Sequence, residues 1–366
     1  MGAFSTMKVL HVGCPYTPYS GGSTVRLRSL VTRYCNADKV KGYLATPISR
    51  SHLTDDYPFV EVYRDQKVNS LRFSRPFFKF VRRVNPDAVV IHNSRALIKW
   101  IVWYRLFFNV KIIVEIHSFR EESPLRTLLN KLLYKFVHGF VVLSKASAQE
   151  LERRYSIINA KVVYNGVEIK KAQILGGGQR LVTFGYLGSF HEWQGVFYIA
   201  HAARILGAEF WENHRLVLAG GGPAYQACLD ILGDLIHHQN IVVKSWVSSE
   251  EAENILGELD YLLAPRPSNL ATETVVPLKV VESIAYKIPL IISNVGGLTE
   301  LLDKKSAIVM SEISADSLAQ AMRLASLKPD YEAMKAELDS KYHSASTWND
   351  SADSYVEYLT CICMNS

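Results

Sequence analysis

The stretch Pro277-Leu-Lys-Val-Val-Glu-Ser-Ile-Ala-Tyr-Lys-Ile-Pro-Leu-Ile-Ile-Ser-Asn-Val-Gly-Gly-Leu-Thr-Glu300 decides the fold. Its first half has apolar residues at helical spacing, and this helical pattern ends before Pro289. Its second half is a short buried strand that leads into the paired glycines Gly296 and Gly297. A helix that returns directly to a buried strand is typical of a parallel α/β sheet.

The same alternation extends along the whole chain. Short apolar runs with β-branched residues are expected as strands of parallel sheets, because right-handed crossovers place helices on both faces of such sheets. The expected strands are Lys8–Val12, Lys41–Ala45, Ala88–Ile91, Lys111–Ile116, Phe140–Leu143, Leu181–Leu187, Arg215–Ala219, Ile241–Val243, Tyr261–Ala264, Pro289–Ser293 and Ala307–Met310. Helical patterns lie near 23–34, 70–84, 95–108, 124–137, 145–154, 195–206, 224–237 and from about 314 to the end.

A polar stretch with Gly176-Gly177-Gly178 interrupts the alternation and is a candidate linker. The alternation on both sides of this linker predicts an α/β protein of two doubly wound, Rossmann-like domains, which comprise residues 1–167 and 180–345. Ligands of such sheets bind beyond the carboxyl ends of the strands, and binding sites are frequent between domains. We therefore expect the functional site in a cleft that the two domains face.

The composition is that of a folded protein without a membrane span. The chain has 366 residues, of which 48% are hydrophobic and 21% charged, which excludes disordered and fibrous classes. No apolar run reaches the ~18 residues of a spanning helix, and no signal-peptide pattern opens the chain. The five cysteines lack CxxC spacing and a nearby group of histidines, so neither disulfides nor a metal site is expected. These features predict a cytoplasmic protein.

The charge is distributed unevenly between the two halves. Residues 1–170 hold 27 Lys and Arg against 12 Asp and Glu, a net charge of +15, whereas residues 171–366 hold 14 against 23, a net charge of −9. An asymmetry of this kind indicates that the first half meets an anionic partner. Nucleic acid, an acidic membrane surface and an anionic small molecule are the candidates.

The first strand-to-helix turn carries the paired glycines Gly21 and Gly22. Such glycines let a backbone approach a phosphate, and the following helix N-terminus favours negative charge. The turn lacks both the GxGxxG pattern and the lysine of a P-loop. A plain flexible connection is the alternative interpretation.

The opening stretch resembles the donor-binding region of glycosyltransferase family 4, retaining enzymes of GT-B fold that use nucleotide sugars. In that family an acidic residue opens a helix of pattern E-A-M-A-x-G-x-P-V-I, and the next strand leads into a G-G-x-x-E turn. Glu282 to Ile291 matches this spacing, and Gly296 to Glu300 follows it. Weaker matches in the family's order are Lys8–Val12 with Gly21-Gly22, Asp87–His92, Val114–His117, Val163–Val167, Gly188–Gly195 and Leu218–Pro223.

The resemblance implies roles for individual residues and a GT-B fold in which a helix of about 346–366 packs back on the first domain. Glu282 would accept hydrogen bonds from the two ribose hydroxyls, and His117 would lie beside the transferred sugar. The donor's sugar and phosphates would contact Gly188 and the backbone of Val276, Pro277 and Leu278, with Gly21 and Gly22 across the cleft. Glu282 could instead be a surface glutamate at a helix start, and His117 a hydrogen-bonded core histidine. No metal or cofactor is required.

Three departures from the family pattern affect the expected site. The family's other acidic residue, eight positions before Glu282, is replaced by Thr274, with Glu273 beside it. The family's arginine and lysine of the first donor-domain loop are replaced by Ser189 and Gln194. Cations at these positions would neutralise the diphosphate leaving group. The candidates to replace them are Arg266 and Lys279, with His191 next; solvated or structural roles are the alternative for Arg266 and Lys279.

Basic and aromatic residues alternate in the first half. Residues 72–83 hold Arg72, Arg75, Lys79, Arg82 and Arg83 among phenylalanines, and 99–108 combine Trp100, Trp103 and Phe107 with cations. Arg126, Lys131 and Lys135 lie among leucines on a third helix. These patterns predict contact with an anionic membrane surface, although helices that cover a sheet also need an apolar face. Nucleic acid is not expected, because no recognition motif accompanies the charge.

These observations predict a retaining glycosyltransferase at the inner face of the membrane. It would move a sugar from a nucleotide diphosphate donor to a glycan or lipid-linked acceptor, in cell-surface polysaccharide or glycoconjugate synthesis. A same-fold nucleotide-sugar epimerase is an alternative within enzymes. A catalytically silent GT-B scaffold is the alternative from another class, favoured by the missing loop cations.

Overall fold

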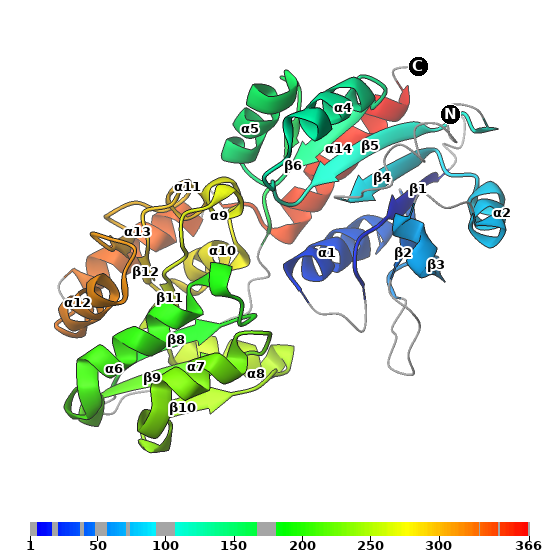
Figure 1. Cartoon of the computed structure of the whole chain (residues 1–366). Helices are drawn as coiled ribbons and strands as arrows, with labels where there is room; N and C mark the ends of the chain where they lie inside the picture. Colours follow the sequence, from blue (N-terminus) through cyan, green and yellow to red (C-terminus); the bar gives the residue numbers. More distant parts are fainter. Residues whose placement is uncertain are drawn as a thin grey trace. The chain divides into compact units, whose positions relative to one another are not determined.

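The computed structural model describes residues 6–16, 21–36, 40–47, 57–70, 74–92, 107–166, 181–328, 330–342 and 345–364. The chain divides into two compact units (Figure 1). The first consists of Met1–Gly166 with Ser346–Ser366, and the second of Val167–Ala345. Each unit is an α/β fold around one parallel sheet. The predicted fold class of two Rossmann-like domains is therefore confirmed.

The first unit has a seven-stranded sheet in the order β3-β2-β1-β4-β5-β6-β7, in which all adjacent strands are parallel. Its strands are β1 Met7–Val12, β2 Val40–Thr46, β3 Glu61–Arg64, β4 Ala88–His92, β5 Lys111–Ile116, β6 Gly139–Val142 and β7 Lys161–Val162. Its described helices are α1 Gly22–Asn36, the short 3₁₀ helix η1 Gln66–Asn69, α2 Arg75–Val84, α4 Pro124–Tyr134, α5 Lys145–Tyr155 and α14 Trp348–Met364. Of the helix predicted near 95–108, residues 95–106 lie outside the described residues.

Helix α14 joins the first unit although it ends the chain. A Cβ on Gly139 of β6 would lie 2.2 Å from Ile362 Cδ1, and Tyr358 Oη accepts a hydrogen bond from the Phe140 amide at 3.0 Å. Figure 1 shows α14, in red, beside the strands of this unit. A side chain at Gly139 would require the side chains of Ile362 and Tyr358 to move.

The second unit has a six-stranded parallel sheet in the order β10-β9-β8-β11-β12-β13. Its strands are β8 Val182–Leu187, β9 His214–Ala219, β10 Ile241–Lys244, β11 Tyr261–Ala264, β12 Leu290–Ile292 and β13 Ala307–Val309. Its helices are η2 Glu192–Gln194, α6 Val196–Glu212, α7 Tyr225–Leu232, η3 Gly233–His237, α8 Ser249–Glu258, α9 Leu270–Thr274, α10 Leu278–Tyr286, α11 Gly296–Thr299, α12 Ala315–Ser326 and α13 Tyr331–Tyr342.

The predicted strands all correspond to observed ones, whereas two helix predictions need correction. The expected helix 224–237 divides into α7 and η3 at Gly233, whose φ of +55° ends the α-helix. The helical tail from about 314 is three separate helices, α12, α13 and α14. Among the helices in the described parts of the chain, none is long and apolar enough to cross a membrane.

Candidate active site

In the second unit, three loops leave the carboxyl ends of the neighbouring strands β9, β8 and β11. They pack so closely that side chains are excluded at two of their residues. A Cβ on Gly220 would lie 1.9 Å from the Gly188 carbonyl oxygen, and one on Gly195 (φ +80°) 1.9 Å from the Pro265 carbonyl oxygen. The loop from Gly188 to Gly195 is thereby fixed against both of its neighbours.

Lys279, in the first turn of α10, reaches the start of this loop. Its Nζ lies 4.4 Å from the centre of the Tyr186 ring and 2.6 Å from the place that a Cβ on Gly188 would occupy. The side chain is 7% exposed. Burial lowers the pKa of Lys279 to about 8; Glu282 opposes this shift and Arg266 adds to it. The missing side chain of Gly188 therefore makes room for a buried ammonium group.

Arg266 is a second buried cation, two residues beyond β11. Its guanidinium lies 5.1 Å from the centre of the Trp193 ring, and Nη1 donates to the Val275 carbonyl oxygen at 3.4 Å. Its Nε is buried and has no hydrogen-bond partner within the part of the chain that the structure describes. Burial lowers the pKa of Arg266 to about 10, an effect that Tyr186 opposes.

Neither cation forms an ion pair in the described ranges of the chain, although Glu282 is near enough to raise the pKa of Lys279. Removing two positive charges from water without an ion pair is costly, unless a ligand supplies the negative charge. The third predicted candidate, His191, stacks on Trp193 with ring centres 5.8 Å apart. His191 and Arg266 therefore contact the same indole ring.

Helix α10 begins at Leu278 after Pro277, which provides no side-chain cap. The first-turn amides of a helix need acceptors from outside it. Glu282 lies one turn further on, half-buried, and makes no hydrogen bond or ion pair with another described residue. Burial raises the pKa of Glu282, while the nearby Lys279 opposes the shift. Val276, just before the helix, is buried.

Thr274, which stands where the family has its other acidic residue, and its neighbour Glu273 both form hydrogen bonds within the second unit. Thr274 Oγ1 donates to the Leu270 carbonyl oxygen at 2.7 Å. Glu273 Oε2 accepts from the Gly296 amide at 2.7 Å, and Glu273 Oε1 accepts from the Ser268 hydroxyl at 2.6 Å. Glu273 thus secures the Gly296-Gly297 turn.

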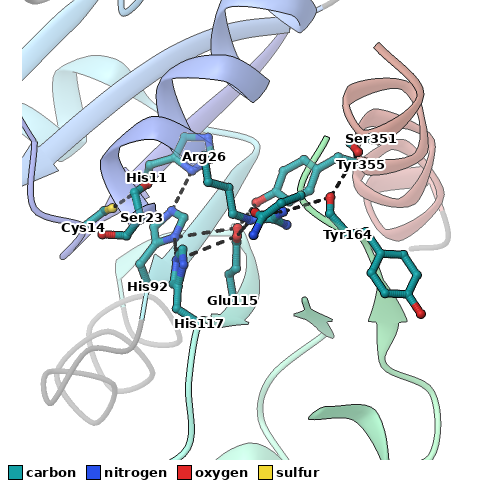
Figure 2. A network of polar contacts seen from close by, with 11 residues as sticks. His11, Cys14, Ser23, Arg26, His92, Glu115, His117, Tyr164, Ser351 and Tyr355 are labelled. Carbon is teal, nitrogen blue, oxygen red and sulfur yellow. Dashed lines mark hydrogen bonds and ion pairs between the residues drawn. The ribbon is translucent and has the colours of Figure 1, made fainter. Parts of the chain in front are cut away.

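The first unit holds a second polar cluster, around His117 at the end of β5 (Figure 2). His11 Nδ1 lies 2.9 Å from His92 Nε2, and His92 Nδ1 lies 2.9 Å from His117 Nε2. His11 Nε2 is bonded to the Tyr34 hydroxyl of α1. The histidines come from β1, β4 and the end of β5, which are adjacent in the sheet, so their rings form a row.

Glu115 supports this row from the neighbouring position of β5. Its Oε1 accepts from Arg26 Nε at 2.7 Å, and its Oε2 accepts from the Tyr355 hydroxyl of α14 at 2.7 Å. Burial raises the pKa of Glu115, but the charge of Arg26, the largest opposing cause, prevails together with its hydrogen bond and lowers this pKa well below its usual range. The carboxylate lies 3.6 Å from His92 Nδ1 and 3.7 Å from His117 Nε2.

Burial favours the neutral form of all three histidines. Burial is the largest cause of the shift in each: it lowers the pKa of His92 to about 3, that of His11 well below its usual value, and that of His117 as well. Each neutral imidazole donates once and accepts once in such a chain. If the Tyr34 hydroxyl donates to His11 Nε2, every tautomer of the row is set in turn, and His117 carries its proton on Nδ1.

Comparisons with known proteins agree with this architecture. The family model "Glycosyltransferase Family 4" matches residues 21–171, and the model "Glycosyl transferases group 1" matches residues 182–326. Together they match most of both units. The chain is a family 4-type glycosyltransferase of GT-B fold.

Individual relatives are more distant. The Bacillus subtilis (strain 168) protein TuaC, named as a glycosyltransferase of teichuronic acid biosynthesis, is 26% identical over 155 residues. That alignment covers 42% of this chain and spans only 35% of the relative's length. Among solved structures, a glycosyltransferase from Rickettsia africae ESF-5 is similar with a TM-score of 0.76 and 15% identity, over 99% of this chain and 100% of the other. Anabaena Alr3699/HepE in complex with UDP and glucose has a TM-score of 0.74 and 15% identity, over 97% and 99%.

The glycosyltransferase carries its first glycine turn at the start of α1. Helix α1 begins at Gly22, and the Gly21 carbonyl accepts from the Val25 amide at 3.0 Å. Thr24 Oγ1 donates to the Pro15 carbonyl oxygen at 3.0 Å, which ties the helix start to the preceding loop. Gly21 and Gly22 therefore lie at a helix N-terminus, as the sequence predicts.

Sequence reasoning missed most of the His117 cluster in this glycosyltransferase. The sequence has no group of histidines beside a cysteine, whereas the fold brings possible ligand atoms of Cys14, His92 and His117 within 4.8 Å of one another. The three residues are far apart in sequence and meet only at the sheet edge. Both nitrogens of His92 already serve the hydrogen-bond row, and burial raises the pKa of the Cys14 thiol, so metal binding would have to break that row. The one available signal was Glu115, a charge inside an apolar strand pattern.

Proposed function

We propose that this glycosyltransferase moves a sugar from a nucleotide diphosphate sugar to a glycan or lipid-linked acceptor, with retention of configuration. The observation that carries the proposal is the pair of buried cations, Arg266 and Lys279, neither of which forms an ion pair with a described residue. A diphosphate leaving group would supply the negative charge that no ion pair provides to these cations. The Anabaena protein, which has the same fold, is described in complex with UDP and glucose, and this supports a uridine or related donor.

The second unit would bind the donor. Glu282 would accept from the ribose hydroxyls, since an ionised carboxylate offers two acceptor oxygens and this one has no described partner. The amides that open α10, around Val276, Pro277 and Leu278, would face the phosphates together with Gly188. His191 would lie at the same loop. Lys279 and Arg266 would stabilise the charge that develops on the diphosphate as the glycosidic bond breaks.

The first unit would bind the acceptor and contact the transferred sugar through His117, with Gly21 and Gly22 toward the donor. Thr274 takes the place of the family's nearest carboxylate, which leaves no evident side-chain nucleophile. We therefore propose front-face transfer, in which the departing phosphate accepts the proton of the acceptor hydroxyl while that oxygen forms the new bond. Side-chain cations and helix N-termini would make a metal or other cofactor unnecessary.

A role in cell-surface polysaccharide or glycoconjugate synthesis, at the inner face of the membrane, completes the proposal. It is supported by the name of TuaC and by the basic face of α2. In α2, Phe77 and Phe80 are buried while Arg75, Lys79, Arg82 and Arg83 are exposed, with Arg83 paired to Glu61. This face would attract anionic lipid by charge alone. Arg72, Trp100 and Trp103 of the predicted contact lie outside the described residues.

The direct test is calorimetric titration with UDP, GDP and ADP, followed by detection of free sugar from the matching nucleotide sugar. Binding of one nucleotide together with slow hydrolysis of its sugar conjugate is expected. Nucleotide binding without any hydrolysis or transfer would favour a silent scaffold, and no binding would contradict the proposed donor site. Anomeric configuration of the product, read by proton NMR, tests retention.

A further inference from the structure

Helix α4 presents its apolar residues outward. None of its residues is buried, and Leu125, Leu128 and Leu132 are 77%, 57% and 49% exposed. Leu129 and, just beyond the helix, Phe136 are also among the exposed large hydrophobic residues. Positions 125, 128, 129, 132 and 136 follow helical spacing, so they form one stripe along the solvent side.

The opposite side of α4 makes the contacts with the protein, and it does so largely through polar and aromatic groups. Tyr134 packs edge-on against Phe140 and Tyr155, with ring centres 5.1 and 4.9 Å away. Asn130 Nδ2 donates to both carboxylate oxygens of Glu122. The amphipathicity of α4 is thus inverted relative to an ordinary surface helix, whose apolar stripe faces the core.

Cations border the leucine stripe. Lys131 and Lys135 lie along one side of it, and Arg126 lies along the other. Lys131 Nζ donates to the Ser156 hydroxyl at 3.0 Å, and Arg126 is 3.5 Å from Glu122. Ile158, which follows Ser156 by two residues, is also largely exposed. The acidic Glu121 and Glu122 precede the helix, and both are near arginines.

We propose that α4 lies in the interface of a bilayer that contains anionic phospholipid, with Leu125, Leu128, Leu129, Leu132 and Phe136 inserted among the acyl chains. Its cations would remain at the headgroups. The helix has 11 residues, about half of what a span needs, so it lies in the interface plane. A second copy of the chain fits less well, because facing α4 helices would bring Lys131 and Lys135 of both copies together, within a half of net charge +15.

This inference extends the membrane contact of the proposed function from a charged face to a specific inserted segment. The two contributions differ in salt dependence: attraction by α2 fades as salt screens it, whereas burial of leucine side chains does not. Insertion therefore predicts that part of the membrane binding persists at high salt.

The experiment is co-flotation with vesicles of 30% phosphatidylglycerol in phosphatidylcholine, at low and high salt. The Leu128→Ser/Leu132→Ser variant is expected to lower the partition coefficient at least tenfold and to abolish the salt-resistant part. The matched control is Leu324→Ser/Leu327→Ser, which changes two exposed leucines of the second unit and is expected to bind as the wild type does. Unchanged thermal unfolding shows that neither variant is misfolded.

A second measurement reports insertion directly. Leu128→Cys, labelled with an environment-sensitive fluorophore in a Cys361→Ser background, is expected to shift to the blue with vesicles, relative to the same background with Leu128 retained. An unshifted label, or undiminished flotation of the leucine variant, overturns the proposal. A wild-type oligomer that dissociates on leucine substitution, seen by sedimentation, also overturns it in favour of a second copy. Nucleotide titration without vesicles tests the donor site separately. The donor-site proposal and the insertion of α4 can therefore be rejected independently.

Discussion

The ammonium group of Lys279 lies 4.4 Å from the centre of the Tyr186 ring, in the space left by the absent side chain of Gly188. The ring face offers a weak electrostatic partner, and it replaces neither water nor a carboxylate. Lys279 is therefore a buried charge that is only partly compensated. Arg266, with its unpartnered Nε, is in the same situation among the described residues. The proposed anionic donor at this loop would compensate both charges.

Donor affinity should depend on pH through Lys279. Because burial lowers its pKa to about 8, the side chain loses its charge as the pH rises through 8, whereas binding of a diphosphate favours the charged form. Nucleotide affinity is expected to fall by up to about tenfold per pH unit above pH 8, since one proton must then be taken up on binding. Titration in buffers of different ionisation enthalpy measures that proton. The Lys279→Arg variant should remove the dependence, and a dependence that survives in it would contradict the assignment.

Arg266→Gln and Lys279→Gln should each lower turnover by about 10²–10³, the usual scale for one lost group that stabilises transition-state charge. Steady-state sugar release measures the effect. Lys287→Gln is the matched control, because Lys287 is an exposed lysine of the same region that pairs with Asp339. If both test variants keep full turnover, His191 becomes the remaining candidate.

Replacement by glutamine should affect nucleotide binding at Glu282 and stability at Glu273. Glu282 makes no hydrogen bond or ion pair with a described residue, so Glu282→Gln is expected to keep the melting temperature and weaken nucleotide binding by about 1.5–3 kcal/mol. Glu273 accepts from the Gly296 amide and the Ser268 hydroxyl, so Glu273→Gln should lower the melting temperature. Calorimetry and thermal unfolding of both variants distinguish the roles. Unchanged nucleotide affinity in Glu282→Gln would reject it as the ribose ligand.

Tyr34 should act as a positioning residue for His117, at the far end of the histidine row. Tyr34→Phe removes the donor that sets the tautomers, and we expect kcat to fall about tenfold, the equivalent of one buried hydrogen bond, with nucleotide affinity unchanged. Nitrogen NMR should show a changed tautomer at His117. Tyr358→Phe is the control: it loses a hydrogen bond to Phe140 in the same unit, outside the row. Equal losses in both variants would indicate a merely structural role.

The first unit should lose stability in mild acid. The folded state keeps His11, His92 and His117 neutral below their ordinary pKa of about 6.5, whereas the unfolded chain takes up protons there. The unfolded state therefore binds more protons, and the free energy of unfolding falls as the pH drops, by up to about 1.4 kcal/mol per pH unit for each histidine. Denaturation between pH 7 and 5, followed by hydrogen exchange in β4 and β5, measures this slope. A free energy of unfolding that does not change between pH 7 and 5 would show that the histidines remain accessible to protons in the folded state.

Several parts of this protein could be derived from the sequence alone. All strands except the short β3 and β7, the two-domain α/β architecture and the family resemblance follow from local patterns, because apolar periodicity and the spacing of Glu282, Pro289, Gly296 and Gly297 are properties of consecutive residues. The candidates Arg266 and Lys279 could also be named, since they follow β11 and open α10 in chain order.

Only the tertiary structure decided which side chains meet. The row from Tyr34 through His11 and His92 to His117 depends on β1, β4 and β5 being neighbours in the sheet, and its support depends on Tyr355 returning from the end of the chain. The stripe on α4 has the periodicity of any amphipathic helix, so its sequence could not show that Tyr134 and Asn130 face the protein and the leucines face outward. Periodicity defines a face of an element. The direction in which that face points is set by what packs against the other side.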